Sequence, residues 1–123
     1  MAQVRPEVAA ALDCYVRELI AQGIDVERVY LFGSQAAGNA HEWSDVDVIV
    51  VSDDFANMPL WKRPDITGSA RSAAFEATGE SVAALAKIPA EVTNCHPASF
   101  LADVLKNAVV VYDRDTVQAG AAT

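Results

Sequence analysis

The chain has 123 residues, of which 52% are hydrophobic and 21% are charged, and its 17 acidic and 9 basic residues give a net charge of -8. This length suits one compact domain with a core, and the apolar content excludes intrinsic disorder over most of the chain. The acidic balance argues against broad contact with nucleic acid, and no apolar run approaches the roughly 20 residues of a membrane span. The sequence has no secretory-signal pattern, and its two cysteines, Cys14 and Cys95, suit buried thiols in a reducing compartment, so we predict a cytoplasmic protein.

The first half of the chain carries clear signals for helices and strands. Pro6 and the apolar residues that follow at helical spacing predict an amphipathic helix over 6–22, which Gly23 ends. β-Branched and aromatic residues predict a strand over 26–32 that runs into a tight turn. A short helix over 35–38 and an apolar strand over 45–52 follow.

The second half is alanine-rich and punctuated by proline and glycine. It predicts short helices near 60–66, 69–78 and 81–87, a strand over 91–95, a helix that Pro97 opens, and a last strand over 109–112. We therefore expect a mixed sheet flanked by helices, of α/β (α+β) class, in one domain over 1–113. Residues 114–123 have little to bury and are expected to form a flexible tail.

Two aspartates at the start of the strand over 45–52 are the first candidate site residues. Alternate side chains of a strand share a face, so Asp45 and Asp47 project the same way and can hold one or two hard divalent cations such as Mg²⁺. Carboxylates this close destabilise each other unless a cation or hydrogen bonds offset the repulsion. The alternative is a solvated strand end with no ligand.

The turn before these aspartates is the second candidate. Gly33 allows the backbone to approach a ligand closely, and Ser34 can offer its hydroxyl to a phosphate oxygen. Helix capping by Ser34 is the alternative role.

Gly33-Ser34, ten further residues and then Asp45-Val46-Asp47 form a pattern that resembles the signature of the DNA polymerase β-like nucleotidyltransferases. Within that superfamily the likeness is to the minimal nucleotidyltransferases (MNT), small proteins that commonly serve as antitoxins to HEPN toxins. The family's third carboxylate corresponds to Glu91 in the segment EVTNCHPASF, where Pro97 and Phe100 match the family's proline and aromatic residue.

The resemblance implies a nucleotidyltransferase fold and a role for each candidate. Asp45 and Asp47 would hold two Mg²⁺ ions, and Gly33 and Ser34 would bind the β- and γ-phosphates of a nucleoside triphosphate. Glu91 would complete one metal site and help to deprotonate the acceptor. The implied activity is transfer of AMP from ATP to a hydroxyl, a tyrosine in our expectation, of a partner HEPN toxin. One alternative is a weakened family member that neutralises its partner by binding alone. Another is transfer to a small hydroxylated molecule such as an aminoglycoside.

The remaining polar and aromatic residues favour ordinary structural roles. We expect the cations of the central segment to lie on solvated helix faces, although one of them could reach the triphosphate or the partner. We expect surface or hydrogen-bonding roles for the histidines and packing roles for the tryptophans. These residues are Lys62, Arg63, Arg71, His41, His96, Trp43 and Trp61.

Overall fold

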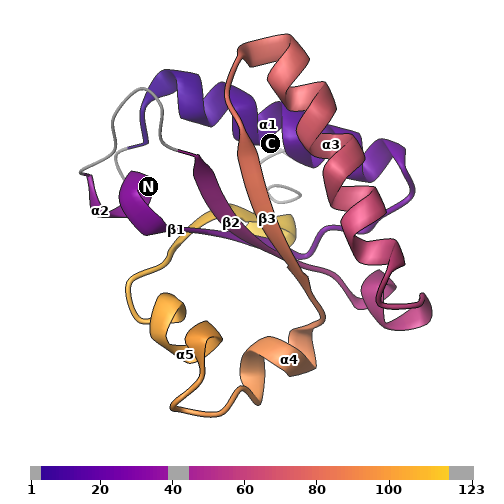
Figure 1. The fold of residues 1–123 in the computed structure, drawn as a ribbon, viewed down its shortest axis with the longest axis vertical. Helices are drawn as coiled ribbons and strands as arrows, with labels where there is room; N and C mark the ends of the chain where they lie inside the picture. Colours follow the sequence, from indigo (N-terminus) through magenta and orange to yellow (C-terminus); the bar gives the residue numbers. More distant parts are fainter. Residues whose placement is uncertain (1–3, 39–44, 117–123) are drawn as a thin grey trace.

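The computed structural model describes residues 4–38 and 45–116, over which helices surround a four-stranded sheet (Figure 1). In chain order the elements are α1 (Pro6–Ala21), β1 (Arg28–Phe32), α2 (Gly33–Ala37), β2 (Val46–Val51), the 3-10 helix η1 (Asp53–Asn57), α3 (Lys62–Thr78), β3 (Val82–Lys87), α4 (Pro89–Thr93), α5 (Phe100–Leu105) and β4 (Val109–Asp113).

The sheet is mixed, with the strand order β3-β2-β1-β4. β1 pairs antiparallel with both β2 and β4, whereas β2 and β3 run parallel, with Val46 opposite Val82 and Val51 opposite Lys87. The predicted α+β class with a mixed sheet is confirmed. Because β2 and β3 are parallel, both begin at the end of the sheet where α2 lies, and both end toward α4 (Figure 1).

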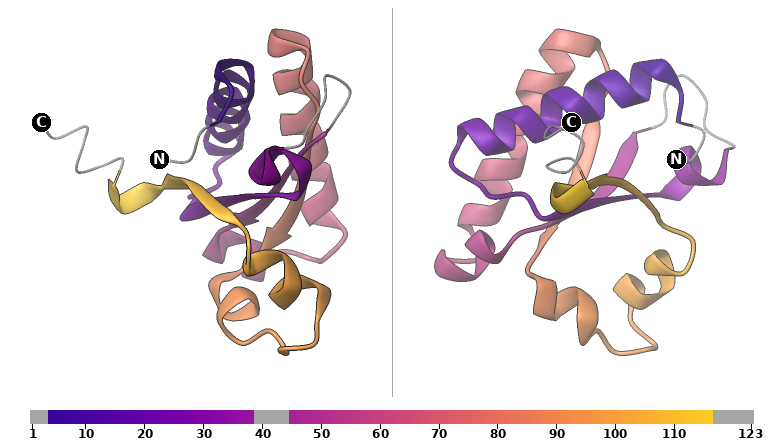
Figure 2. Two further views of the ribbon diagram at one scale, coloured as in Figure 1. Left: turned by 90° about the vertical axis from the view of Figure 1, so that its left-hand side faces the viewer. Right: turned by 180° about the vertical axis from the view of Figure 1, so that it is seen from behind.

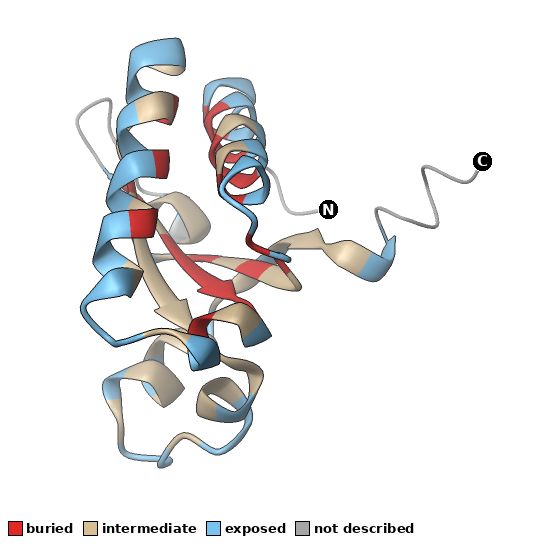
Figure 3. Cartoon of the chain, turned by 90° about the vertical axis from the view of Figure 1, so that its right-hand side faces the viewer, coloured by how far each residue is buried: buried red, intermediate tan, exposed pale blue. Residues whose placement is uncertain are grey.

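The hydrophobic core lies between one face of the sheet and the helices α1 and α3 (Figures 2 and 3). α1 buries one stripe at spacings of three and one, which is the spacing of a single helix face. Val46, Val48 and Val50 of β2 point into the same core. The short helices α4 and α5 lie on the other side of the sheet (Figure 2). The stripe of α1 consists of Val8, Ala11, Leu12, Tyr15, Val16 and Leu19.

One continuous helix, α3, replaces the two short helices predicted over 60–66 and 69–78. Pro64 lies in the first turn, where its missing N–H has no partner within the helix to lose. Gly68 lies in the helix interior, where glycine costs about 1 kcal/mol relative to alanine. Burial of Ile66, Ala70 and Ala74 offsets that cost, so neither breaker ends the helix.

Two predicted elements are wrong. The segment predicted as a helix over 81–87 is the strand β3, because parallel pairing with β2 outweighs the helix propensity of its alanines. The segment predicted as a strand over 91–95 belongs mostly to α4, which Pro89 opens from the first helical position. The helix predicted from Pro97 begins at Phe100, with the side chain of Ser99 accepting a hydrogen bond from the backbone N–H of Ala102 at 3.1 Å.

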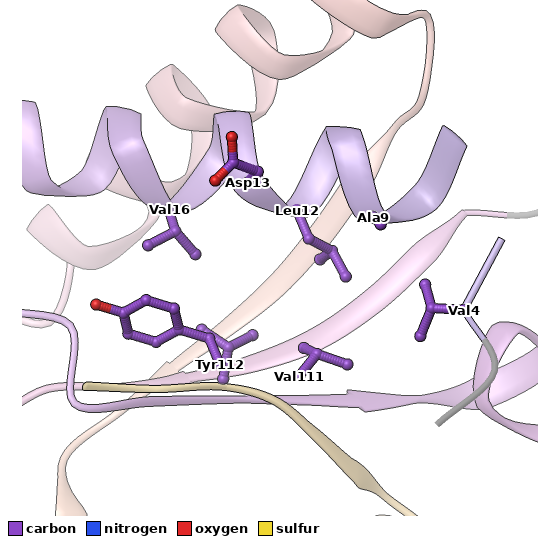
Figure 4. A pocket seen from close by; sticks show the side chains of 8 residues that line it. Val4, Ala9, Leu12, Asp13, Val16, Val111 and Tyr112 are labelled. Atoms are coloured by element: carbon purple, nitrogen blue, oxygen red, sulfur yellow. The ribbon is translucent and has the colours of Figure 1, made fainter. Parts of the chain in front are cut away.

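The edge strand β4 packs loosely beneath α1 and leaves an apolar cavity of about 270 Å³ (Figure 4). Leu12 and Val16 line it from α1, and Val111 and Tyr112 line it from β4. Arg114 continues from β4 by donating its backbone N–H to the Glu27 carbonyl, so the predicted tail is attached at its first residue. Residues 117–123 of that tail lie outside the described part. None of the described helices is long and apolar enough to cross a membrane.

Candidate functional site

The aspartate pair lies where β2 begins. Asp45 directly precedes the strand and Asp47 is its second residue, and Asp47 pairs with Phe32 of β1 on one side and with Ala83 of β3 on the other. Asp47 alternates with Val46 and Val48, which point into the core, so its side chain lies on the opposite face of the sheet. Asp45 has an exposed side chain, and Asp47 is half-buried.

The surroundings of Asp47 disfavour its negative charge. Partial burial and the neighbouring charge of Asp45 raise the pKa of Asp47 above its ordinary value, and Arg71 offsets part of that rise. A raised carboxyl pKa means that the folded protein holds the negative charge at a cost. A divalent cation placed between the carboxylates would remove this cost.

The first residue of α2 lies against Asp47. Gly33 has a φ of +73°, and a Cβ built on it would lie 2.5 Å from Oδ2 of Asp47. The backbone conformation therefore favours glycine here, and any side chain would have to displace the Asp47 carboxylate. Ser34 follows inside the first turn of α2, whereas Phe32 occupies the cap position, so Ser34 is not the capping residue of this helix. The structure thus brings Gly33, Ser34, Asp45 and Asp47 to one place.

Arg71 reaches the same place from α3. Its Nε and Nη2 donate to the hydroxyl oxygen of Ser81 at 2.9 and 2.6 Å, and its Nη2 lies 3.9 Å from Oδ2 of Asp45. Ser81 directly precedes β3, and its carbonyl accepts the Val46 N–H at 2.8 Å. Sequence reasoning named Arg71 but missed Ser81, since the strand that positions Ser81 has the composition of a helix.

Glu91 lies elsewhere. It is in α4, beyond the C-terminal end of β3, whereas the aspartates lie at the start of the parallel strand β2. From Ala83, opposite Asp47, to Lys87 is about 13 Å along the strand, and Glu91 lies four residues further on. The structure therefore does not bring Glu91 together with Asp45 and Asp47, contrary to our expectation.

Local contacts explain why Glu91 is held there. Its Oε1 accepts the Ile88 N–H at 2.8 Å and Nη1 of Arg63 at 2.9 Å. Burial alone would raise the pKa of Glu91, but these hydrogen bonds and the charge of Arg63 lower it below its ordinary value. Arg63 is only 12% exposed and also donates to the carbonyls of Ala86 and Phe55. Glu91 and Arg63 together fasten α4 to α3 and β3.

The donor set near Asp47 suits one divalent cation. Two carboxylates with substrate phosphate oxygens and water form the kind of shell that Mg²⁺ accepts. Over residues 4–38 and 45–116, no three His, Cys, Asp or Glu side chains come together as a metal site. The residue beside Asp47 on β3 is Ala83, whose methyl group cannot bind a metal.

An open cavity of about 600 Å³ adjoins this turn. Gly33 and Phe32 line one side, and Phe100, Asp103 and Asn107 line the other. Phe100 is exposed, with its ring available to a ligand. The cavity has the size of a small-molecule site, and Gly33, which lines it, also lies against Asp47.

Other residues singled out in the sequence lie apart from the aspartates. His96 accepts a hydrogen bond from the Ala98 N–H in a turn. Trp61 is exposed at the start of α3 with Lys62 over its ring, so it does not have the packing role that we predicted. Both cysteines are free and half-buried. His41 and Trp43 lie outside the described residues.

Comparison with solved structures supports the fold. A proposed nucleotidyltransferase from Sulfolobus solfataricus matches with a TM-score of 0.56 and 19% identity, over 94% of each chain. A toxin–antitoxin structure with AMP-PNP matches with a TM-score of 0.54 and 17% identity, over 83% of this chain and 73% of that one. A MntA-HpeT toxin–antitoxin mutant with two aspartate-to-glutamate substitutions has a TM-score of 0.52 and 14% identity, over 82% and 72%. At these identities the likeness establishes the fold.

Sequence comparison establishes the family. Among curated proteins, no significant match to the chain was found. The family model of the nucleotidyltransferase domain matches residues 14–97, which is more than half of the chain and includes Gly33, Ser34, Asp45 and Asp47. The chain therefore belongs to the nucleotidyltransferase domain family.

Proposed function

We propose that this chain transfers AMP from Mg²⁺-bound ATP to a tyrosine hydroxyl of a HEPN-family toxin and thereby acts as its antitoxin. The observation that carries the proposal is the close approach of Gly33 to Asp47. Gly33 leaves room for the Asp47 carboxylate, which a side chain at this position would have to displace. A turn kept open in this way beside two carboxylates suits a metal-bound phosphate.

Each residue has a defined part in this activity. Asp45 and Asp47 hold the cation, and Gly33 and Ser34 contact the phosphates. Mg²⁺ supplies charge neutralisation at the transferred phosphorus and the leaving pyrophosphate. The cavity beside Gly33 has room for the nucleoside, with Phe100 positioned for contact with the base.

The antitoxin role rests on two supports. Two of the structures with this fold are toxin–antitoxin structures, one of them with AMP-PNP. The chain also exposes large apolar side chains at the start of α3, where Leu60 and Trp61 are 72% and 66% exposed, and a protein partner would cover such residues.

The test follows label from ATP into protein. The purified chain is incubated with Mg²⁺, α-labelled ATP and the lysate of its own host. Label should enter one partner protein, and the substitutions Asp45→Asn and Asp47→Asn together should abolish it. Asp53→Asn, an exposed aspartate in η1, is the matched control and should label normally. Equal labelling by the double variant would refute the proposal.

A second candidate, neutralisation by binding alone, is favoured by the position of Glu91. Glu91 is engaged with Arg63 and Ile88, and Ala83 occupies the place beside Asp47, so the aspartates have no third carboxylate from these two positions. Under this candidate the double variant still captures the partner and still protects cells, although no label is transferred by either protein. Loss of protection in the double variant would exclude it.

A further inference from the structure

Arg71 is the one guanidinium seen against the aspartate pair in the described part of the chain. Ser81 accepts two hydrogen bonds from it, which fixes the plane of the guanidinium beside Asp45. The separation of 3.9 Å from Oδ2 of Asp45 is too long for a hydrogen bond. Arg71 is therefore anchored on Ser81, and the rest of its donors are not committed to Asp45.

The charges and ligands around Asp47 limit how many metal ions the site can take. Asp45 and Asp47 contribute two negative charges, and Arg71 already contributes one positive charge. A second divalent cation would add repulsion with Arg71 and would need further oxygen ligands. The neighbouring position on β3 offers only the methyl group of Ala83.

We propose that this site uses one divalent cation, and that Arg71 provides the second positive charge by binding the triphosphate of the nucleotide directly. The inference rests on the proposed function and replaces the two Mg²⁺ ions expected from the family resemblance. A guanidinium binds phosphate oxygens through paired N–H donors and remains charged at all accessible pH values. In phosphoryl transfer an arginine of this kind stabilises charge that develops on the phosphates.

The first test counts metal ions. Mn²⁺ is titrated into the chain with AMP-PNP in the absence of any acceptor protein, so that the bond between its α- and β-phosphates, which AMP transfer would break, stays intact, and bound Mn²⁺ is measured by electron paramagnetic resonance. We expect one Mn²⁺ per chain. Ala83→Asp places a third carboxylate beside Asp47 and should raise the number to two. Leu85→Asp lies on the same face two residues further along β3 and is the matched control, which should stay at one.

The second test measures the role of Arg71 without any turnover. Arg71→Gln should weaken Mn²⁺-dependent binding of AMP-PNP at least tenfold and should leave binding of AMP, which lacks the β- and γ-phosphates, unchanged. Ser81→Ala, which removes the anchor, should give a smaller loss in the same direction. Arg17→Gln is the control, because Arg17 forms an exposed ion pair with Asp13 within α1. All variants are first compared with the parent by circular dichroism and urea unfolding.

Two results would overturn the inference. One is the binding of two Mn²⁺ ions by the parent chain. This result counts against the inference even if the additional ligand is Glu42, which lies outside the described residues, and Glu42→Gln then reduces the number to one. The other is unchanged AMP-PNP binding by folded Arg71→Gln. Failure of the proposed function looks different, because Asp45→Asn with Asp47→Asn would then bind Mn²⁺ and AMP-PNP as the parent does.

Discussion

Replacing Glu91 should damage the stability of the fold and spare the aspartate site. In Glu91→Ala, the Ile88 N–H loses its acceptor, and a guanidinium that is only 12% exposed loses its carboxylate partner. A lost helix cap costs about 1 kcal/mol, and a hydrogen bond between charged groups is worth about 1.5–3 kcal/mol. Glu91 is itself 35% exposed, and water screens part of the second contribution. The expected loss in free energy of unfolding is about 2 kcal/mol.

Urea unfolding followed by circular dichroism measures this loss. A chain of this size has an m-value of about 1.5 kcal/mol/M, so the midpoint should fall by about 1.3 M. Glu91→Gln keeps an oxygen acceptor for the Ile88 N–H but loses the charge, and should lie about halfway between the parent and Glu91→Ala.

The pH dependence of the Glu91 effect has a defined sign. Hydrogen bonds from Ile88 and Arg63 lower the pKa of Glu91 in the folded state. Its contribution is therefore complete above the unfolded pKa of about 4.3 and is lost as the pH falls through the folded pKa. The gap between the parent and Glu91→Gln should be full at pH 7 and should close below about pH 4.

Two observations would refute this account of Glu91. One is an unfolding midpoint in Glu91→Ala equal to that of the parent. The other is loss of Mn²⁺ binding in a Glu91→Gln protein that is as stable as the parent, because Glu91 would then belong to the metal site after all.

Three further predictions concern the site itself. Gly33→Ala and Gly38→Ala both place alanine at a positive φ, but only the first would collide with Asp47, so Gly33→Ala should lose about 1 kcal/mol more in urea unfolding and should alone weaken Mn²⁺ binding. Asp47→Asn should abolish Mn²⁺ binding yet unfold at the same or a higher urea concentration at pH 7. Because the folded pKa of Asp47 is raised, that stability advantage should disappear as the pH falls toward the unfolded pKa of about 3.9, and the control Asp53→Asn should bind Mn²⁺ as the parent does. Phe100→Ala should weaken AMP-PNP binding about tenfold in a calorimetric titration with little change in stability, since the ring is 66% exposed and one base stacked on an aromatic ring is worth about 1–3 kcal/mol.

The sequence predicted the elements whose signal is local. Spacing and composition predict the apolar stripe of α1 and the turn at Gly33 after β1. They also predict the pair Asp45 and Asp47 at the start of β2. They form as predicted because each depends on its own residues and on burial of one face.

What the sequence could not predict depends on contacts between distant segments. Half of the residues of β3 are alanine, and this segment is a strand because β2 offers it a parallel partner. Once β3 is taken for a helix, Ala83 and Ser81 cannot be recognised as neighbours of the aspartates. The family resemblance assigns Glu91 the role of third ligand on a strand predicted over 91–95, but that segment lies mostly in α4, and Arg63, 28 residues earlier in the chain, holds Glu91 away from the site.

Two arginines of α3 donate hydrogen bonds toward β3: Arg63 to the Ala86 carbonyl, and Arg71 to Ser81 just before the strand. The two arginines lie about 12 Å apart along the helix. Over its whole length α3 buries three residues, Ile66, Ala70 and Ala74, whereas α1 buries six. A helix that buries fewer residues is expected to open at a lower free energy than α1. We therefore expect the amide protons of α3 to exchange with solvent ahead of those of α1, and a nucleotide that engages Arg71 to slow the exchange of α3.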